Sequence, residues 1–250
     1  MRALDAEHYV TEVRLRRERV ASPDAYPYSL PVLRNFASLK LHPAVTFLVG
    51  ENGSGKSTLL EAIATAWGFN PEGGTRNFRF ATFDSHSSLH ENLLLVKTPR
   101  RPKDGFFLRA ESFYNVASEI QALDEGPGGP PIIHSYGGRS LHAQSHGESF
   151  FALMTHRFGG QGFYLLDEPE AALSPARQLA MLARLHELVK QRSQFIVATH
   201  SPILLSYPDA WIYQASDEGL ARVRYEDTEH YELTRSFLNN PQGFLRNLLD

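Results

Sequence analysis

Residues 50–57 read Gly-Glu-Asn-Gly-Ser-Gly-Lys-Ser and fit the pattern G-x-x-x-x-G-K-[ST]. Glycines at this spacing permit a turn whose backbone N–H groups converge on phosphate oxygens. The pattern predicts that Lys56 bridges the β- and γ-phosphates of ATP and that the Ser57 hydroxyl binds Mg²⁺. Thr58 is expected to cap the next helix and to touch the α-phosphate. The residues predicted here to bind the nucleotide are Gly50, Glu51, Asn52, Gly53, Ser54, Gly55, Lys56, Ser57 and Thr58.

Two adjacent carboxylates follow the apolar segment 163–166. One carboxylate can hold the Mg²⁺ shell while its neighbour polarises an attacking water. We therefore predict Asp167 as a metal ligand and Glu168 as the general base. Taken alone, such a pair is equally typical of a surface turn. Its occurrence together with the glycine-rich loop favours the site.

His200 follows a third apolar segment, 194–198, within the sequence Thr-His-Ser-Pro. A histidine beside the phosphates can hydrogen-bond the γ-phosphate and help to align the water, so we predict His200 as a catalytic residue. The alternative is a purely structural hydrogen-bond donor. The position of His200, one helix and one strand after Glu168, favours the catalytic interpretation.

The elements that must position these residues alternate along the chain. Segments 45–49, 162–166 and 194–198 are apolar and short, as in buried parallel strands. A helix is expected from Ser57 to Gly68 and another over 176–191. We expect these helices to bury the following side chains: Leu59, Leu60, Ile63 and Ala64 in the first, and Leu179, Leu182, Leu185 and Leu188 in the second. The order predicts an α/β fold with a mostly parallel sheet and a ligand at the carboxyl ends of its strands.

The length of 250 residues favours one domain. We expect a nucleotide-binding core over about 1–75 and 150–215, with an N-terminal antiparallel β part. The looser pattern between them predicts an inserted, partly helical subdomain over about 76–149. Residues 216–250 form a C-terminal extension.

Composition excludes several classes of function. The chain has no cysteine, which removes disulfides, thiolate metal sites and cysteine nucleophiles and suits a reducing cytoplasm, where we expect the protein to reside. Its formal net charge of −3 gives no overall attraction for nucleic acid. The longest apolar runs are far too short to cross a bilayer, so we expect no direct membrane insertion.

The ordered motifs resemble those of the ABC ATPase superfamily, from about residue 33 to about residue 207. GENGSGKST is similar to the Walker A motif, YLLDEP to Walker B, EAALS to the D-loop and THS to the switch-histidine loop. Residues 145–149, Ser-His-Gly-Glu-Ser, stand where the family has its LSGGQ or LSGGE signature, although the leucine is missing and histidine replaces the first glycine.

This resemblance implies an ATPase that dimerises around two MgATP. In the family, the signature of one subunit contacts the γ-phosphate held by the other subunit. Carried over, Ser145, Gly147 and Glu148 would complete the site of a second copy. Considered alone, the same residues are typical of a helix cap.

The sequence departs from the family where a glutamine normally contacts the metal and the water. Glu111, after the expected strand 106–109, is predicted as a metal ligand in its place, with a solvated carboxylate as the alternative. The aromatic residue that stacks on adenine is open among Tyr26, Tyr28 and Phe36.

The residues after the Walker B and switch motifs favour one branch of the family. Asp-Glu-Pro-Glu at 167–170 and His-Ser-Pro at 200–202 resemble the stand-alone ATPases together with SMC, RecF-like and overcoming-lysogenization-defect ATPases. The favoured hypothesis is an ATPase that acts on a nucleic-acid or protein partner in DNA maintenance or defence. One alternative is the ATP-binding subunit of an ABC transporter, with a permease as partner; another is an ATP-binding module without turnover.

Overall fold

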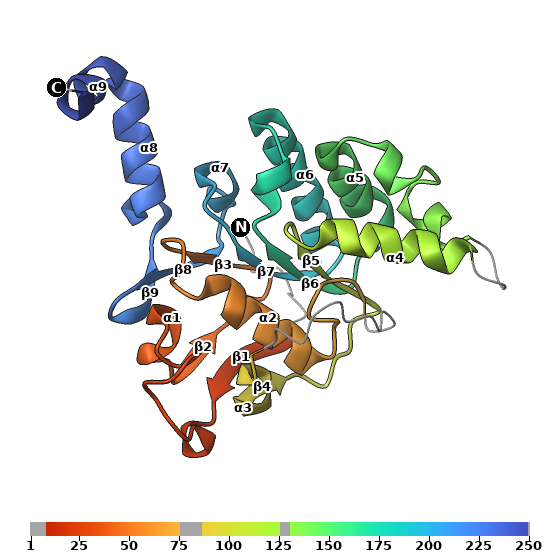
Figure 1. Ribbon diagram of the computed structural model, residues 1–250, viewed down its shortest axis with the longest axis horizontal. Coiled ribbons are helices and arrows are strands. Elements are labelled where there is room, and N and C mark those ends of the chain that lie inside the picture. Colours follow the sequence, from red (N-terminus) through yellow and green to blue (C-terminus); the bar gives the residue numbers. More distant parts are fainter. Residues whose placement is uncertain (1–8, 76–86, 126–130, 250) are drawn as a thin grey trace.

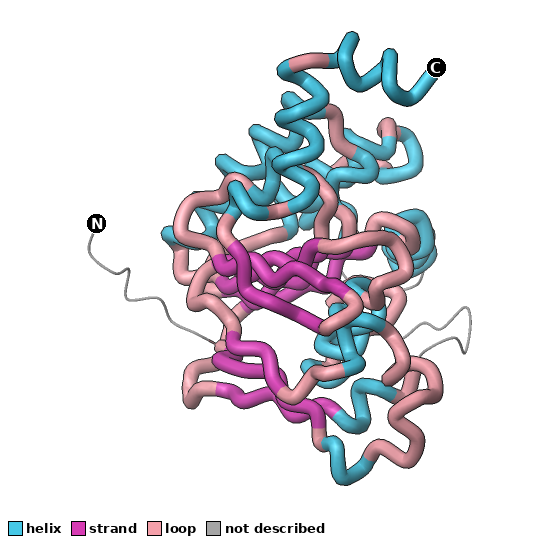
Figure 2. Tube along the Cα trace, turned by 90° about the vertical axis from the view of Figure 1, so that its left-hand side faces the viewer, coloured by secondary structure: helices cyan, strands magenta, loops and turns pink. Residues whose placement is uncertain are grey.

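The computed structural model describes residues 9–75, 87–125 and 131–249. Within these residues, a larger sheet has the strand order β5-β6-β7-β3-β8-β9 and a smaller one the order β2-β1-β4. Figure 2 shows the two sheets as separate groups of strands. The strands are β1 (Val10–Leu15), β2 (Ser38–Lys40), β3 (Val45–Val49), β4 (Leu93–Lys97), β5 (Asp104–Arg109), β6 (Gly162–Asp167), β7 (Gln194–Ala198), β8 (Trp211–Ser216) and β9 (Gly219–Val223).

The larger sheet is parallel from β5 to β8, and β9 joins its edge as an antiparallel strand. The smaller sheet is antiparallel throughout. The predicted α/β fold with an N-terminal antiparallel part is therefore confirmed. The helices are α1 (Pro31–Arg34), α2 (Lys56–Trp67), α3 (Leu89–Asn92), α4 (Phe113–Glu125), α5 (His146–Ala152), α6 (Pro175–Lys190), α7 (Pro202–Leu205), α8 (Glu229–Asn239) and α9 (Pro241–Leu249).

Alternate residues of the parallel strands enter two different cores, because side chains of a strand point to opposite faces in turn. In β6, Phe163 and Leu165 pack with α2 and the smaller sheet, whereas Tyr164 and Leu166 pack with α4, α5 and α6. Both faces of the sheet are thus covered, which explains why these strands are apolar at every position. Figure 1 shows α2 between the two sheets and α4, α5 and α6 on the other side.

The helix α6 corrects one detail of the sequence analysis. Leu185 and Leu188 are buried as predicted, but Leu179 is 60% exposed and Met181 is buried instead. Residues nine apart in a helix point in nearly opposite directions, since each residue turns by about 100°. Leucines at every third position therefore cannot share one face. The four residues expected inside α2 are all buried, since their spacing fits one helical face.

The segment 76–149, predicted as an inserted subdomain, contributes to both sheets. Its strand β4 pairs with β1, and its strand β5 pairs with β6. Apart from the short helix α3, the described helices of this segment begin at α4, after both strands. Residues 76–86 and 126–130 of the predicted insertion lie outside the described part of the chain. The division into core, insertion and extension stays a prediction.

None of the described helices is long and apolar enough to cross a membrane.

A partly buried ion pair ties the start of β5 to the segment before β6. Asp104 Oδ1 lies 2.7 Å from Arg157 Nη1, while Oδ2 accepts hydrogen bonds from the Tyr164 hydroxyl (2.7 Å) and the Gly159 N–H (3.0 Å). Burial alone raises the pKa of Asp104, but Arg157 and the two donors outweigh it, so the pKa lies below its ordinary value of 3.8.

Replacing Asp104 with alanine is expected to lower the free energy of unfolding at pH 7 by about 2 kcal/mol, because the partly buried Arg157 loses its charged partner. Since the folded state depresses the pKa of Asp104, its contribution is complete above the ordinary aspartate pKa and is lost as the pH falls below it. The difference between variant and wild type should therefore shrink under acid conditions. Urea unfolding across this range measures both effects. The exposed Asp217, changed to alanine, is the control and should leave the midpoint unchanged.

Candidate nucleotide site

The glycine-rich loop connects β3 to α2 at the carboxyl end of the sheet. Gly50, Gly53 and Gly55 all have positive φ, at 148°, 79° and 96°. A Cβ on Gly50 would lie 2.9 Å from the Ala215 side chain, and one on Gly55 would lie 2.7 Å from Val32 Cγ1. Glycine is therefore required at both positions by conformation and by space. The strand–loop–helix context expected for a phosphate-binding loop is present.

Lys56 is held inside this loop. Its ammonium donates hydrogen bonds to the carbonyl oxygens of Gly50 (2.7 Å) and Glu51 (2.9 Å), and the residue is 4% exposed. Burial lowers the pKa of Lys56, while the carboxylates of Glu168 and Asp167 oppose this effect. A positive charge is thus fixed beside Glu168, the predicted general base, and Asp167, the predicted metal ligand.

The structure corrects the predicted role of Thr58 as a helix cap. Gly55, in the left-handed conformation, is the N-cap of α2, and Thr58 already lies within the first turn. The loop glycine thus starts the helix three residues before Thr58. The predicted contact of Thr58 with the α-phosphate stays a prediction.

Ser57 and Asp167, both predicted as metal ligands, are in direct contact. The Ser57 hydroxyl donates a 2.9 Å hydrogen bond to Asp167 Oδ1, across 110 positions of sequence. Burial raises the pKa of Asp167 to about 6, although Arg109 and Ser57 lower it. Hydroxyl and carboxylate oxygens are ligands that Mg²⁺ prefers, so these residues fit the ion. Among the described residues, no group of three or more His, Asp or Glu could hold a metal ion.

Arg109 is a site residue that the sequence analysis missed. Its guanidinium contacts Glu61 (2.8 Å), Glu111 (3.2 Å) and Asp167 (3.6 Å). The sequence did contain a signal, because Arg109 ends the strand expected over 106–109. Parallel pairing places it directly beside Asp167, at the end of β6.

Glu111 lines the same pocket as Ser57, Asp167 and Glu168, a cavity of about 430 Å³. Its side chain is 83% exposed and paired with Arg109, as in the solvated alternative. The structure therefore gives its predicted role as a metal ligand no support beyond this shared pocket.

Glu168 and His200 lie together at the ends of β6 and β7. His200 Nε2 is 3.7 Å from Glu168 Oε1. Glu168 has a positive φ of 49°, which turns the chain away from the strand, and its side chain is 43% exposed. The backbone N–H of His200 donates a 2.5 Å hydrogen bond to Glu170, a second residue that the sequence analysis did not assign. Burial lowers the pKa of His200, and the charge of Lys56 lowers it further.

Residues 145–149, the predicted signature segment, begin α5. The Ser145 backbone N–H donates to Glu148 Oε2 (3.1 Å), and the Ser145 hydroxyl accepts from the Glu148 N–H (3.4 Å), which makes a capping box. A Cβ on Gly147 would lie 2.5 Å from the carbonyl oxygen of Ala172, so this glycine permits close packing against the turn after Glu168. Glu148 lines a hollow of about 840 Å³ formed by α5, the segment before it and α6, and neither Ser57 nor Asp167 lines this hollow.

The three aromatic residues considered for adenine differ in exposure. Phe36 is buried, and the Tyr28 hydroxyl accepts a 2.5 Å hydrogen bond from Asn92. Tyr26 is 66% exposed. Among the three, only the ring of Tyr26 is largely free to stack on a ligand.

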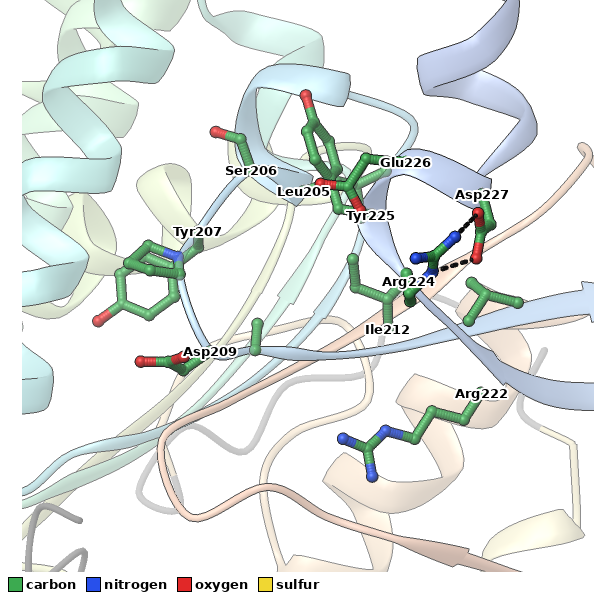
Figure 3. Close-up of a pocket in the computed structure, with 13 residues that line it drawn as sticks. Leu205, Ser206, Tyr207, Asp209, Ile212, Arg222, Arg224, Tyr225, Glu226 and Asp227 are labelled. Atoms are coloured by element: carbon green, nitrogen blue, oxygen red, sulfur yellow. Dashed lines mark hydrogen bonds and ion pairs between the residues drawn. The ribbon is translucent and has the colours of Figure 1, made fainter. Parts of the chain in front are cut away.

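A further pocket, of about 630 Å³, lies between the segment before β8 and the turn after β9 (Figure 3). It contains none of the residues predicted to bind nucleotide. Its Arg224 and Asp227 form a two-pronged ion pair, with both contacts at 2.7 Å. This exposed pair joins the two ends of the turn that leads into α8.

Two family models match separate parts of the chain. A family model described as "AAA domain" matches residues 30–101, and one described as "AAA domain, putative AbiEii toxin, Type IV TA system" matches residues 134–206. No curated protein sequence matches the chain.

Solved structures share the fold at low sequence identity. CbiO1 from Clostridium perfringens, part of the ABC transporter complex cbiONQ, is 18% identical, with a TM-score of 0.53 over 96% of this chain and 100% of that one. MJ1267, an ATP-binding cassette of an ABC transporter in its ADP conformation, is 18% identical, with a TM-score of 0.50 over 94% and 97%. The SMC head domain from Thermotoga maritima is 18% identical, with a TM-score of 0.46 over 86% and 98%.

Each family model covers less than a third of the chain. Together with the phosphate-binding loop and the fold shared with ATP-binding cassettes, the two models support an ABC-type P-loop ATPase.

Proposed function

We propose that two copies of this chain close around two MgATP and hydrolyse ATP to ADP and phosphate. One observation carries this proposal: Ser57, Asp167, Glu168, His200 and Lys56 come from three strand ends and converge at one edge of the sheet. Such convergence at the carboxyl ends of parallel strands is where this architecture binds its ligand.

Each residue has a defined role in this proposal. The loop N–H groups and Lys56 bind the β- and γ-phosphates, and Lys56 offsets the charge that develops on them. Ser57 and Asp167 would hold Mg²⁺, which would supply further charge neutralisation when bound with the nucleotide. Glu168 accepts the proton of the attacking water. His200 donates a hydrogen bond from Nε2 to the γ-phosphate.

The second copy completes the site. Within one chain, Ser145 and Glu148 bond to each other at the start of α5, and Glu148 faces a separate hollow. We propose that Ser145, Gly147 and Glu148 instead contact the γ-phosphate held by the other copy. The hydroxyl and the first N–H groups of a helix suit an anion.

The physiological role that we favour is a stand-alone cytoplasmic ATPase that acts on a nucleic-acid or protein partner in DNA maintenance or defence. The family description that includes a putative AbiEii toxin of a Type IV TA system supports a role in defence. The similarity to cbiO1 and MJ1267 keeps a transporter subunit as the second candidate. A permease that copurifies with the chain would favour the transporter.

Two measurements on the purified protein test the proposal. We expect phosphate release from MgATP, and a molecular mass in size-exclusion light scattering that doubles when ATP is bound. Adding double-stranded DNA to the assay distinguishes the two roles, since stimulation favours DNA maintenance or defence. A folded protein that binds MgATP but neither dimerises nor releases phosphate would contradict the proposed function.

A further inference from the structure

The C-terminal extension reaches the proposed catalytic histidine through one side chain. His230, in the first turn of α8, has its Nε2 2.9 Å from His200 Nδ1. The two rings lie 5.1 Å apart at an angle of 50°. Figure 1 shows that α8 otherwise rises away from the sheet, and none of its residues is buried. The contact between the imidazoles therefore needs an explanation other than core packing.

The turn before α8 fixes the place of His230. Thr228 caps the helix, and its hydroxyl also donates a 2.7 Å hydrogen bond to the Tyr225 carbonyl. The Tyr225 hydroxyl donates to the carbonyl oxygen of Pro202, two residues after His200 (3.0 Å). Figure 3 shows Tyr225 in this turn beside the paired Arg224 and Asp227. Two contacts thus join the segment that carries His200 to the segment that carries His230. They are the hydrogen bond from Tyr225 to Pro202 and the contact between the two imidazoles.

We propose that His230 is a positioning residue for ATP hydrolysis: it donates its Nε2–H to His200 Nδ1 and so keeps the proton of His200 on Nε2. This inference rests on the proposed function, because Nε2 is the atom that would donate to the γ-phosphate. Histidine tautomers are set by the partner of the other ring nitrogen.

The surroundings favour this arrangement over the reverse one, in which His200 Nδ1–H would donate to His230 Nε2. His200 Nε2 faces the Glu168 carboxylate at 3.7 Å, which attracts a proton on Nε2 and would repel a lone pair there. Both His200 Nε2 and His230 Nδ1 are buried without a hydrogen-bond partner among the described residues. Each arrangement therefore leaves one of these two atoms carrying an N–H without a close acceptor. In the proposed arrangement that N–H is on His200 Nε2, opposite the Glu168 carboxylate, whereas in the reverse one it is on His230 Nδ1, for which the described residues provide no such carboxylate.

Neither ring is expected to be doubly protonated at neutral pH. Burial lowers the pKa of His200 and that of His230, and the charge of Lys56 lowers both further. Glu51 opposes these effects at both rings, joined by Glu168 at His200 and by Glu229 at His230. With both rings neutral, the contact carries a single shared hydrogen.

A spectroscopic experiment tests the tautomer without any catalysis. Long-range ¹H–¹⁵N spectra of the ¹⁵N-labelled protein at neutral pH report which imidazole nitrogen is protonated, and a His200→Gln variant assigns the signal. We expect His200 to carry its proton on Nε2 and His230→Ala to give a mixture of tautomers. A wild-type His200 protonated on Nδ1 would overturn the inference, whether or not the protein hydrolyses ATP.

Kinetics test the role itself. His230→Ala should lower kcat about 10-fold with little change in KM, a loss typical of residues that orient a reacting group. His230→Gln, whose amide can still donate, should recover part of this loss. In a His200→Ala background, His230→Ala should have no further effect. The control is Glu232→Ala on the exposed part of α8. Wild-type rates for His230→Ala, or a full additional loss in the double variant, would overturn the inference.

Discussion

Glu168→Gln is expected to lower kcat for ATP hydrolysis by roughly 100- to 10,000-fold, the range that general base catalysis contributes. Glutamine keeps the size of the side chain but cannot accept the proton of the attacking water. MgATP binding should persist, because Lys56 and the loop N–H groups are unchanged. The variant should therefore accumulate as an ATP-bound dimer, measured by light scattering with and without MgATP.

The matched control for this prediction is Glu218→Gln, on an exposed loop. It should hydrolyse ATP at the wild-type rate. If Glu168→Gln also keeps the wild-type rate, Glu168 is not the general base. A slow variant that stays monomeric with ATP would instead argue against closure around the nucleotide.

The second large effect is expected for Lys56→Ala. Removing one partner of a buried charge pair costs roughly 2–5 kcal/mol. MgATP affinity should therefore fall by roughly 30-fold or more. Isothermal titration calorimetry with MgATP measures the loss directly. The fold should be kept, because the change also removes a buried charge whose hydrogen bonds are confined to the loop.

Lys190→Ala, at the exposed end of α6, is the control for nonspecific charge effects. Its affinity should equal that of the wild type. An unchanged affinity for Lys56→Ala, with an unchanged unfolding midpoint, would remove Lys56 from the binding site.

The sequence was sufficient for the sheet core and for the convergence of the main motifs. Strands 45–49 and 194–198 match the structure because parallel strands buried on both faces are apolar throughout. Once those strands are assigned, the residues that follow them must share one edge of the sheet. The meeting of Ser57 with Asp167 follows from this rule alone.

What escaped prediction depends on register and on distant contacts. Arg109 becomes a site residue only because β5 pairs in register with β6, and a single sequence does not reveal that pairing. His230 meets His200 through a turn whose geometry rests on the contact between Tyr225 and Pro202. Leu179 is exposed, contrary to the prediction, because leucines spaced three residues apart drift away from one face of a helix whose period is 3.6 residues.

The arginine at the end of β5 affects the order in which ligands arrive. Arg109 lies 3.6 Å from one oxygen of Asp167, and Ser57 is bonded to the other. A bare divalent cation that approaches this carboxylate must therefore displace one of these two partners. A triphosphate brings several negative charges of its own, which can hold the cation on the way to the site. Magnesium should consequently enter the protein already chelated by its nucleotide.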